Sequence, residues 1–175
     1  MLVTTKELLC VANAENKAIG AFNITGLETL QAVLQAAESR KEPVILQFAQ
    51  VHEEEQIISL NIIGPIMVMM ADQATIPVAV HLDHGVDLHI LKKALDMGFT
   101  SIMFDGSSLP YGENIAYTRD GCQYGAGIRS QCGGGNRSDG WDYPQRSENN
   151  RKPQGGSKDV YRSSDCTGFC RKDRC

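Results

Sequence analysis

Four short apolar segments of this 175-residue chain end on side chains that can do chemistry. The side chains are Asn23, Gln47, the neighbouring pair Asp83 and His84, and Asp105. When strands run parallel, their carboxyl ends meet at one edge of the sheet, where the active sites of α/β proteins lie. A carboxylate beside an imidazole can bind a divalent metal or transfer a proton. We therefore expect Asp83, His84 and Asp105 to converge on one site.

The His81–His84 run is the most informative of these strand ends. Alternation along a strand places His81 and Asp83 on one face and Leu82 on the other. His84 lies at the edge, where the following Gly85 allows the alternation to relax. The alternative interpretation is a purely structural pair, satisfied by hydrogen bonds at a strand end. Asp105, at the end of the next strand, favours a functional site.

Strands and helices alternate through the first two-thirds of the sequence. Short apolar and β-branched runs predict strands, and apolar residues at helical spacing predict helices. Asp87 is placed to cap one helix, and Gly98 to end it. The short connections imply parallel strands and right-handed crossovers, so a doubly wound sheet and half of an eight-unit barrel both fit. The strands are expected at 18–24, 43–49, 78–84 and 101–107, and the helices at 27–37, 60–70, 87–97 and 111–119.

Other reactive residues are weaker candidates. His52 precedes three glutamates, Glu53–Glu55, a run that is typical of a solvated surface. His89 stands among the apolar residues of a helix, where packing or surface exposure is expected. The last five cysteines lack the paired short spacings of a zinc ribbon. No G-x-G-x-x-G motif follows the first strand, so the sequence does not favour nucleotide binding.

The composition changes abruptly after Arg119. Residues 1–119 carry 7 Lys+Arg and 14 Asp+Glu, whereas residues 120–175 carry 10 and 7. Among Ile, Leu, Val, Met and Phe, the second region holds only Ile128, Val160 and Phe169, too few to form a core. We expect residues 120–175 to be disordered. No apolar run is long enough for a membrane span and no signal-peptide pattern is present, so we expect a cytoplasmic protein that binds neither membrane nor nucleic acid.

The stretch from Leu8 to Arg119 resembles the class II, metal-dependent ketose-bisphosphate aldolases. The matching segments, in order, are AFNI at Ala21–Ile24, PVILQFA at Pro43–Ala49, VHLDHG at Val80–Gly85, MGF at Met97–Phe99 and SIMFDGSSLPYGEN at Ser101–Asn114. The resemblance implies a (β/α)8 TIM barrel, of which this chain holds about the first four units. It also implies reversible, zinc-dependent cleavage of fructose 1,6-bisphosphate or tagatose 1,6-bisphosphate in glycolysis or related carbohydrate metabolism. The products are dihydroxyacetone phosphate and glyceraldehyde 3-phosphate.

The same resemblance implies a role for each site residue. Asp83 matches the proton donor and acceptor of the family, and His84 matches its first zinc ligand. Asp105 matches a carboxylate associated with a second divalent-metal position, and Asn23 lies at the substrate-facing end of the first strand. Ala49 stands where many relatives have serine. A small phosphorylated sugar is the implied substrate, and a homo-oligomer is implied for the intact family member. A Schiff-base aldolase using Lys92 or Lys93 is the less favoured alternative, because both lie in mid-helix.

Residues 120–175 are interpreted as an out-of-frame translation of a gene of this family. Removing one base from the codon of Asp120 permits codons for strings that resemble the missing fifth strand of the family and the segment after it. No histidine follows His89, so the later zinc ligands of the family are absent from this sequence. The alternative function is therefore a non-catalytic half-barrel with at most weak binding of a metal or a partner.

Overall fold

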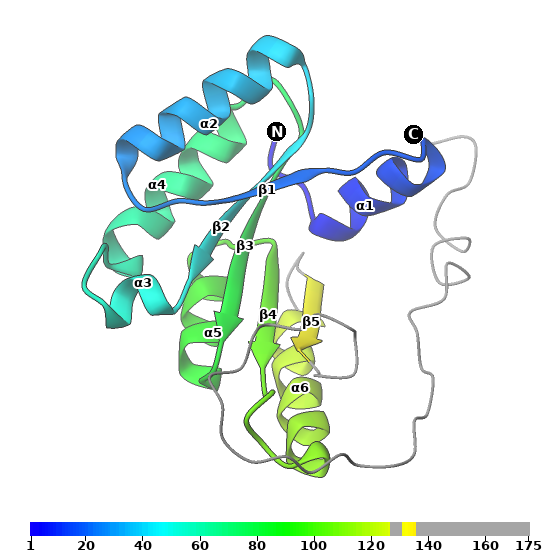
Figure 1. The fold of residues 1–175 in the computed structure, drawn as a ribbon, viewed down its shortest axis with the longest axis vertical. Helices are drawn as coiled ribbons and strands as arrows, with labels where there is room; N and C mark the ends of the chain where they lie inside the picture. Colours follow the sequence, from blue (N-terminus) through cyan, green and yellow to red (C-terminus); the bar gives the residue numbers. More distant parts are fainter. Residues whose placement is uncertain (127–130, 136–175) are drawn as a thin grey trace, which may run out of the picture. The chain divides into compact units, whose positions relative to one another are not determined.

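A computed structural model describes residues 1–126 and 131–135 of the chain (Figure 1). These residues belong to the first of two units, Met1–Asn136. The structure within this unit alternates strands and helices, as the sequence predicts. The expected disorder of residues 120–175 concerns mainly residues outside the described ranges, so it stays a prediction.

The strands form one parallel sheet with the order β1-β2-β3-β4-β5. The four predicted strands are all present, and their parallel arrangement is confirmed. A fifth strand, which the composition did not predict, pairs with β4. The bounds are β1 Gly20–Asn23, β2 Val44–Ala49, β3 Val78–Gly85, β4 Ser101–Asp105 and β5 Gln131–Gly135.

Helices connect consecutive strands. The four predicted helices are present as α2 Leu27–Arg40, α4 Leu60–Gln73, α5 Leu88–Asp96 and α6 Tyr111–Ala126. Two more, α1 Thr5–Ala14 and the short α3 Val51–Glu54, were not predicted. Helix α6 continues seven residues past Arg119, so the described secondary structure does not stop where the composition changes. Within the described ranges, no helix is long and apolar enough to cross a membrane.

Local sequence signals explain where α5 begins and ends. The side chain of Asp87 accepts a hydrogen bond of 2.6 Å from the His89 amide, as an N-terminal cap does. Gly98 has φ 98°, a left-handed conformation that terminates the helix without a steric penalty. Both predictions at these positions are confirmed. They matter for function because they fix the length of the connection between β3 and β4.

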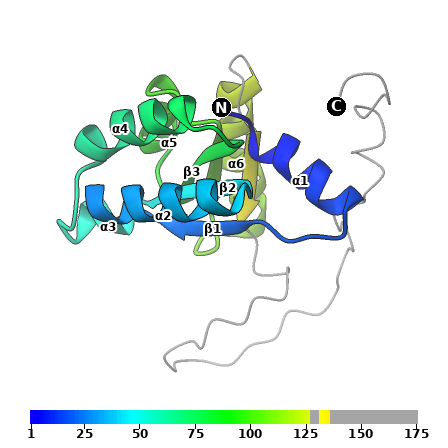
Figure 2. The ribbon, with the colours of Figure 1, turned by 90° about the horizontal axis from the view of Figure 1, so that it is seen from above.

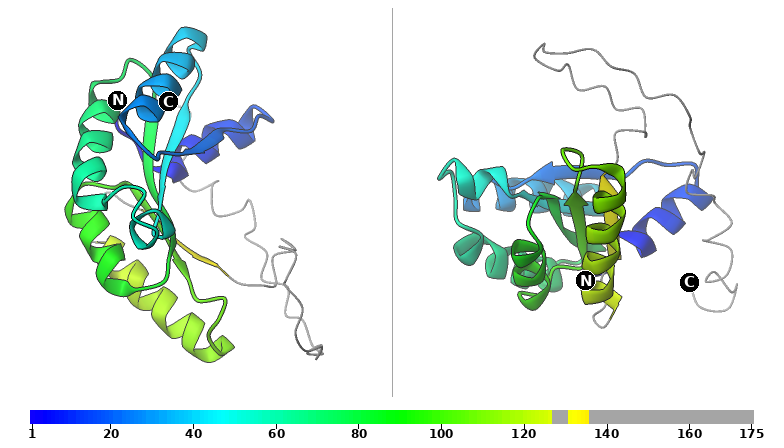
Figure 3. Two further views of the ribbon diagram at one scale, coloured as in Figure 1. Left: turned by 60° about the vertical axis from the view of Figure 1, so that its left-hand side comes forward. Right: turned by 90° about the horizontal axis from the view of Figure 1, so that it is seen from below.

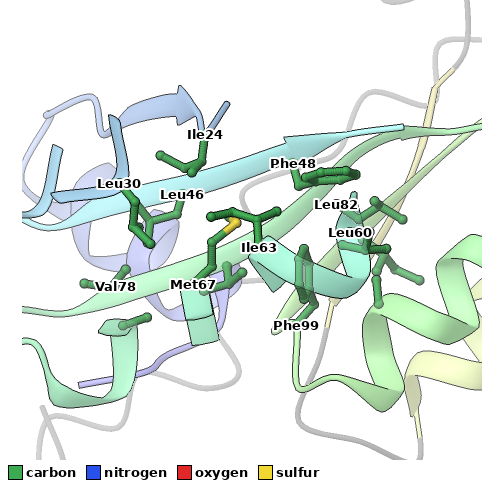
Figure 4. Packing of buried hydrophobic residues seen from close by; sticks show 14 of the residues in the cluster. Ile24, Leu30, Leu46, Phe48, Leu60, Ile63, Met67, Val78, Leu82 and Phe99 are labelled. Carbon is green, nitrogen blue, oxygen red and sulfur yellow. The ribbon is translucent and has the colours of Figure 1, made fainter. Parts of the chain in front are cut away.

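The main hydrophobic core lies between the sheet and the layer of helices α2, α4 and α5. Side chains from β2 and β3 meet helical side chains there, and Figure 4 shows Phe48, Leu82, Leu60, Ile63 and Phe99 in this packing. In Figure 3, α4, α5 and α6 follow one side of the curved sheet, whereas α1 lies on the other side. We call the side covered by α2, α4 and α5 the outer face of the sheet.

The opposite, inner face is only partly covered. Leu8 of α1 packs with Ile45 and Ala79 in a small second cluster, and seen from above α1 lies apart from the other helices (Figure 2). Every residue of β1 is exposed. Strand pairing aligns one row of polar residues across this face, consisting of Asn23, Gln47, His81 and Ser101. The inner face therefore carries the polar side chains of the sheet.

Candidate active site

The carboxyl ends of β3 and β4 bring Asp83, His84 and Asp105 together. The His84 Nδ1 atom lies 2.7 Å from Asp105 Oδ2, a hydrogen bond between adjacent strands. Asp83 Oδ1 lies 3.9 Å from His84 Nε2. Both carboxylate side chains are mostly buried, whereas the His84 side chain is about half exposed, at 49%. An exposed imidazole flanked by two carboxylates is suited to metal binding or proton transfer.

The backbone at His84 departs from the regular strand. His84 has φ 49°, the left-handed region that non-glycine residues rarely adopt. The register between β3 and β4 shifts between Leu82 and Gly85, which matches the relaxed alternation expected there. A Cβ atom at position 85 would lie 2.4 Å from the Leu91 Cδ1 atom, so any residue other than glycine would require the Leu91 side chain to move. Strained backbone of this kind concentrates at functional sites.

Asp105 is held in its ionised form by its neighbours. Its Oδ1 atom accepts a 3.0 Å hydrogen bond from the Ser107 amide, and its Oδ2 atom pairs with His84. Burial raises the pKa of Asp105, but the hydrogen bonds from His84 and Ser107 outweigh it and leave the pKa below its ordinary value. Since both oxygens have partners, Asp105 is well placed to fix the orientation of the His84 ring.

His81 lies beneath the site on the same face as Asp83. Its Nδ1 atom is 2.8 Å from Ser101 Oγ, and its Nε2 atom is 4.0 Å from Asp83 Oδ1. Burial lowers the pKa of His81 to about 4, against the opposing effect of Asp83. The imidazole is therefore neutral at pH 7. Asp83 consequently lies between two imidazole rings, with both Nε2 atoms at about the same distance from one carboxylate oxygen.

The structure corrects the prediction for His52. This residue is 6% exposed and is not part of a solvated surface. Its ring packs edge-on against Phe48, with ring centroids 5.4 Å apart. Burial lowers the pKa of His52, opposed by the charge of Asp83. The alternation of polar and apolar types could not reveal this, because α3 is only one turn long. His89, by contrast, is exposed, in line with its prediction.

Gln50 is a site residue that the sequence analysis missed. It joins β2 to α3, and its Oε1 atom accepts a 2.9 Å hydrogen bond from the Val86 amide. Its own amide lies 3.3 Å from the Asp83 carbonyl oxygen. A glutamine after a strand carries no distinctive pattern, so no sequence signal would have identified it.

The remaining candidates lie away from this cluster. Asn23 is exposed at the carboxyl end of β1, separated from β3 by β2. Lys92 pairs with Asp96 at 2.7 Å within α5, and Lys93 lies 3.7 Å from Glu53. Both lysines belong to α5, which covers the outer face, whereas Asp83 lies on the inner face. The geometry gives no support to a Schiff-base mechanism.

The donor types at the site fit a zinc ion, although their number is small. Because His84 Nδ1 pairs with Asp105, its Nε2 atom is the nitrogen available to a metal. In the described part of the chain, no group of three or more His, Cys, Asp or Glu residues is arranged to hold a metal ion. Protein zinc sites use three or four ligands, so the described residues would supply only part of one.

Comparison with known proteins identifies the family. Residues 3–129 match the family "Fructose-bisphosphate aldolase class-II". A fructose-bisphosphate aldolase of Staphylococcus aureus is 37% identical over 145 residues, which cover 79% of this chain and 51% of the relative. A 6-phospho-5-dehydro-2-deoxy-D-gluconate aldolase of Halalkalibacterium halodurans is 38% identical over 131 residues, covering 70% of this chain and 43% of the relative.

Solved structures give the same result. The crystal structure of the YdjI aldolase from Escherichia coli K12 superposes with a TM-score of 0.69 at 33% identity, covering 75% of this chain and 50% of that chain. The chain thus spans about half the length of the relatives it matches. The family match covers β1 to β4, including every residue of the site described above. The chain belongs to the class II fructose-bisphosphate aldolase family.

Proposed function

We propose that this chain carries the N-terminal part of the active site of a class II aldolase. The reaction is reversible cleavage of fructose 1,6-bisphosphate or tagatose 1,6-bisphosphate into dihydroxyacetone phosphate and glyceraldehyde 3-phosphate. The observation that carries the proposal is the cluster of Asp83, His84 and Asp105 at adjacent strand ends, within the segment that matches the family.

Asp83 is the proposed proton acceptor. In cleavage, its carboxylate removes the proton of the C4 hydroxyl as the C3–C4 bond breaks, and it returns that proton to the aldehyde in condensation. Its Oδ1 atom is 3.9 Å and 4.0 Å from the Nε2 atoms of His84 and His81, outside direct hydrogen-bond distance. This oxygen is therefore free to accept a proton from a substrate hydroxyl.

His84 is the proposed zinc ligand, through Nε2. Asp105 holds Nδ1 and so fixes the ring, and by family likeness its carboxylate is also associated with a second divalent-metal position. A bound zinc ion supplies Lewis-acid stabilisation of the negative charge that develops when the C3–C4 bond breaks. The residues of this chain orient the ring and hold the proton.

The substrate contact, oligomeric state and localisation are also proposed from membership of the family. Asn23, exposed at the end of β1, is the proposed contact to a small phosphorylated sugar. The intact protein is proposed to be a cytoplasmic homo-oligomer that acts in glycolysis or related carbohydrate metabolism. The matched relatives include aldolases named for two different substrates, so the choice between sugars is left to direct assay.

A second candidate is a non-catalytic half-barrel. It is favoured by the absence of any histidine after His89. In this proposal, residues 120–175 are an out-of-frame reading, and the polypeptide as written is inactive. Sequencing the DNA around codon 120 tests this directly. An extra base there, with an intact frame downstream, supports the aldolase, whereas residues 120–175 confirmed in transcript and peptide favour the non-catalytic half-barrel.

Two variants test the proposed roles in a protein whose frame has been restored by removing one base at codon 120. Asp83→Ala is expected to lower the rate of cleavage by about 10²-fold or more while zinc content is retained, because the carboxylate transfers a proton. His84→Ala is expected to lose both zinc and activity. Equal zinc content in the parent protein and His84→Ala would contradict the ligand role, and unchanged cleavage by Asp83→Ala would contradict the proton-transfer role.

A further inference from the structure

Gln50 makes two hydrogen bonds to the backbone of β3 and the residue after it, one on each side of the strained residue His84. The Gln50 amide donates to the carbonyl oxygen of Asp83, the residue before His84, at 3.3 Å. The Gln50 side chain accepts from the amide of Val86, two residues after His84, at 2.9 Å. One residue at the end of β2 therefore holds the chain on both sides of the left-handed turn in β3.

The Gln50 side chain is itself fixed in place. Its Nε2 atom donates a 2.7 Å hydrogen bond to Glu54 Oε1, one turn further along α3. This bond orients the amide group so that Oε1, and not Nε2, faces the Val86 N–H. The orientation matters because only the oxygen can accept that proton.

Strand β4, which pairs with the other edge of β3, cannot by itself hold the backbone at His84. Regular pairing of β3 with β4 is interrupted between Leu82 and Gly85, so the ladder leaves His84 without its usual backbone support there. Gly85 pairs again with Phe104, and the His84 ring bonds to Asp105. A left-handed non-glycine residue persists only where its surroundings hold it. Gln50 supplies that hold from the β2 side.

We infer that Gln50 is a positioning residue for His84, because it locks the left-handed backbone that aims the His84 ring at Asp105. The inference concerns the metal-free chain. It rests on the proposed function only for its consequence, which is that a correctly aimed Nε2 atom binds zinc. Gln50 itself touches neither substrate nor metal in this account.

The test compares variants of the chain as it exists. Gln50→Met removes the acceptor and keeps the side-chain length, whereas Gln50→Glu keeps an acceptor oxygen. Gln35→Met, at an exposed position of α2, is the matched control. In each protein without metal, the exchange rate of the Val86 amide proton and the tautomer of the His84 ring are measured by NMR.

Gln50→Met is expected to speed exchange of the Val86 amide about fivefold to tenfold, as loss of one hydrogen bond does. It is also expected to mix the His84 tautomers, because the Nδ1–H to Asp105 contact loosens. Gln50→Glu is expected to restore both readouts only in part, because it keeps an acceptor for the Val86 amide but loses the donor to Glu54. Gln35→Met is expected to leave both unchanged. Val86 exchange and a His84 tautomer unaltered in Gln50→Met would overturn the inference.

Zinc titration separates this inference from the proposed function. His84→Ala tests the ligand role without involving Gln50, so retained zinc binding in that variant counts against the proposed function alone. The NMR readouts decide the role of Gln50 in either case. With the ligand role intact, weaker zinc binding in Gln50→Met than in Gln35→Met supports the positioning role, and equal binding opposes it.

Discussion

The two faces of the sheet differ in how completely the rest of this chain covers them. On the outer face, Leu46, Phe48, Val80 and Leu82 are all fully buried beneath helices. On the inner face, the side chains of His81 and Asp83 keep 16% and 18% exposure, and Asn23 is exposed. The outer face thus holds the main core, and the inner face holds the candidate site. We propose that the inner face depends on further chain for completion, because the chain spans only about half the length of its relatives.

Substitutions at two neighbouring positions of β3 test the difference between the two faces with the largest expected effect. Leu82→Ala removes a side chain with 0% exposure from the main core and is expected to lower the free energy of unfolding by about 3 kcal/mol. Asp83→Ala, one residue on, is expected to change it by less than about 1 kcal/mol, because the carboxylate lies beyond hydrogen-bond distance of both imidazoles. Urea denaturation of the two variants and the parent measures both effects. Equal losses would remove the distinction between the faces.

The buried His81 makes the inner face sensitive to acid. Its pKa falls from 6.5 to about 4 on folding, so the unfolded chain binds a proton more readily than the folded one. The contribution of the neutral His81 ring to the free energy of unfolding is complete above pH 6.5. It is lost as the pH falls from 6.5 toward 4. Between pH 7 and 5 the loss from His81 is expected to be about 2 kcal/mol.

Replacing His81 isolates this contribution. His81→Asn keeps a polar group near Ser101 without a titrating ring, so its stability is expected to fall less steeply between pH 7 and 5 than that of the parent. His89→Asn changes an exposed histidine and is expected to leave the slope unaltered. Parallel pH profiles for the parent and His81→Asn would show that His81 does not titrate as described.

A non-glycine residue with left-handed backbone occurs both at the end of an outer-face helix and in the candidate site. Only at the helix end can glycine relieve the conformational strain without changing a site residue. Lys41 ends α2 with φ 56°, and His84 has φ 49° in the site. Lys41→Gly is expected to raise the free energy of unfolding by about 0.5–1 kcal/mol, since glycine adopts this conformation without strain. Arg40→Gly, within the last turn of α2, is the control and is expected to lower it by up to about 1 kcal/mol. Thermal denaturation that ranks the two variants in the reverse order would contradict this.

Periodicity was sufficient to predict the outer face. The strand at 78–84 and the helix that begins after Asp87 follow directly from apolar spacing and a capping residue. The positions of Asp83, His84 and Asp105 at neighbouring strand ends also followed, because parallel strands place their carboxyl ends together. These features depend on residues close together in the sequence.

Features set by contacts across the sheet were not predictable. His52 lies in a charged run, yet it is buried and its ring packs against Phe48 of β2. Gln50 acts through the Val86 amide, 36 residues away, which no local pattern encodes. Strand β5 lies in a glycine-rich segment, where backbone pairing with β4 places a strand that composition does not favour.

The central claim is that the inner face needs the remaining chain of its relatives to become an aldolase site. The direct measurement is cleavage of fructose 1,6-bisphosphate and tagatose 1,6-bisphosphate with added zinc, using the 175-residue protein beside a version with one base removed at codon 120. The expected result is turnover by the corrected protein and none by the chain as written. Comparable turnover by both proteins would contradict the account, because residues 120–175 would then complete a working site.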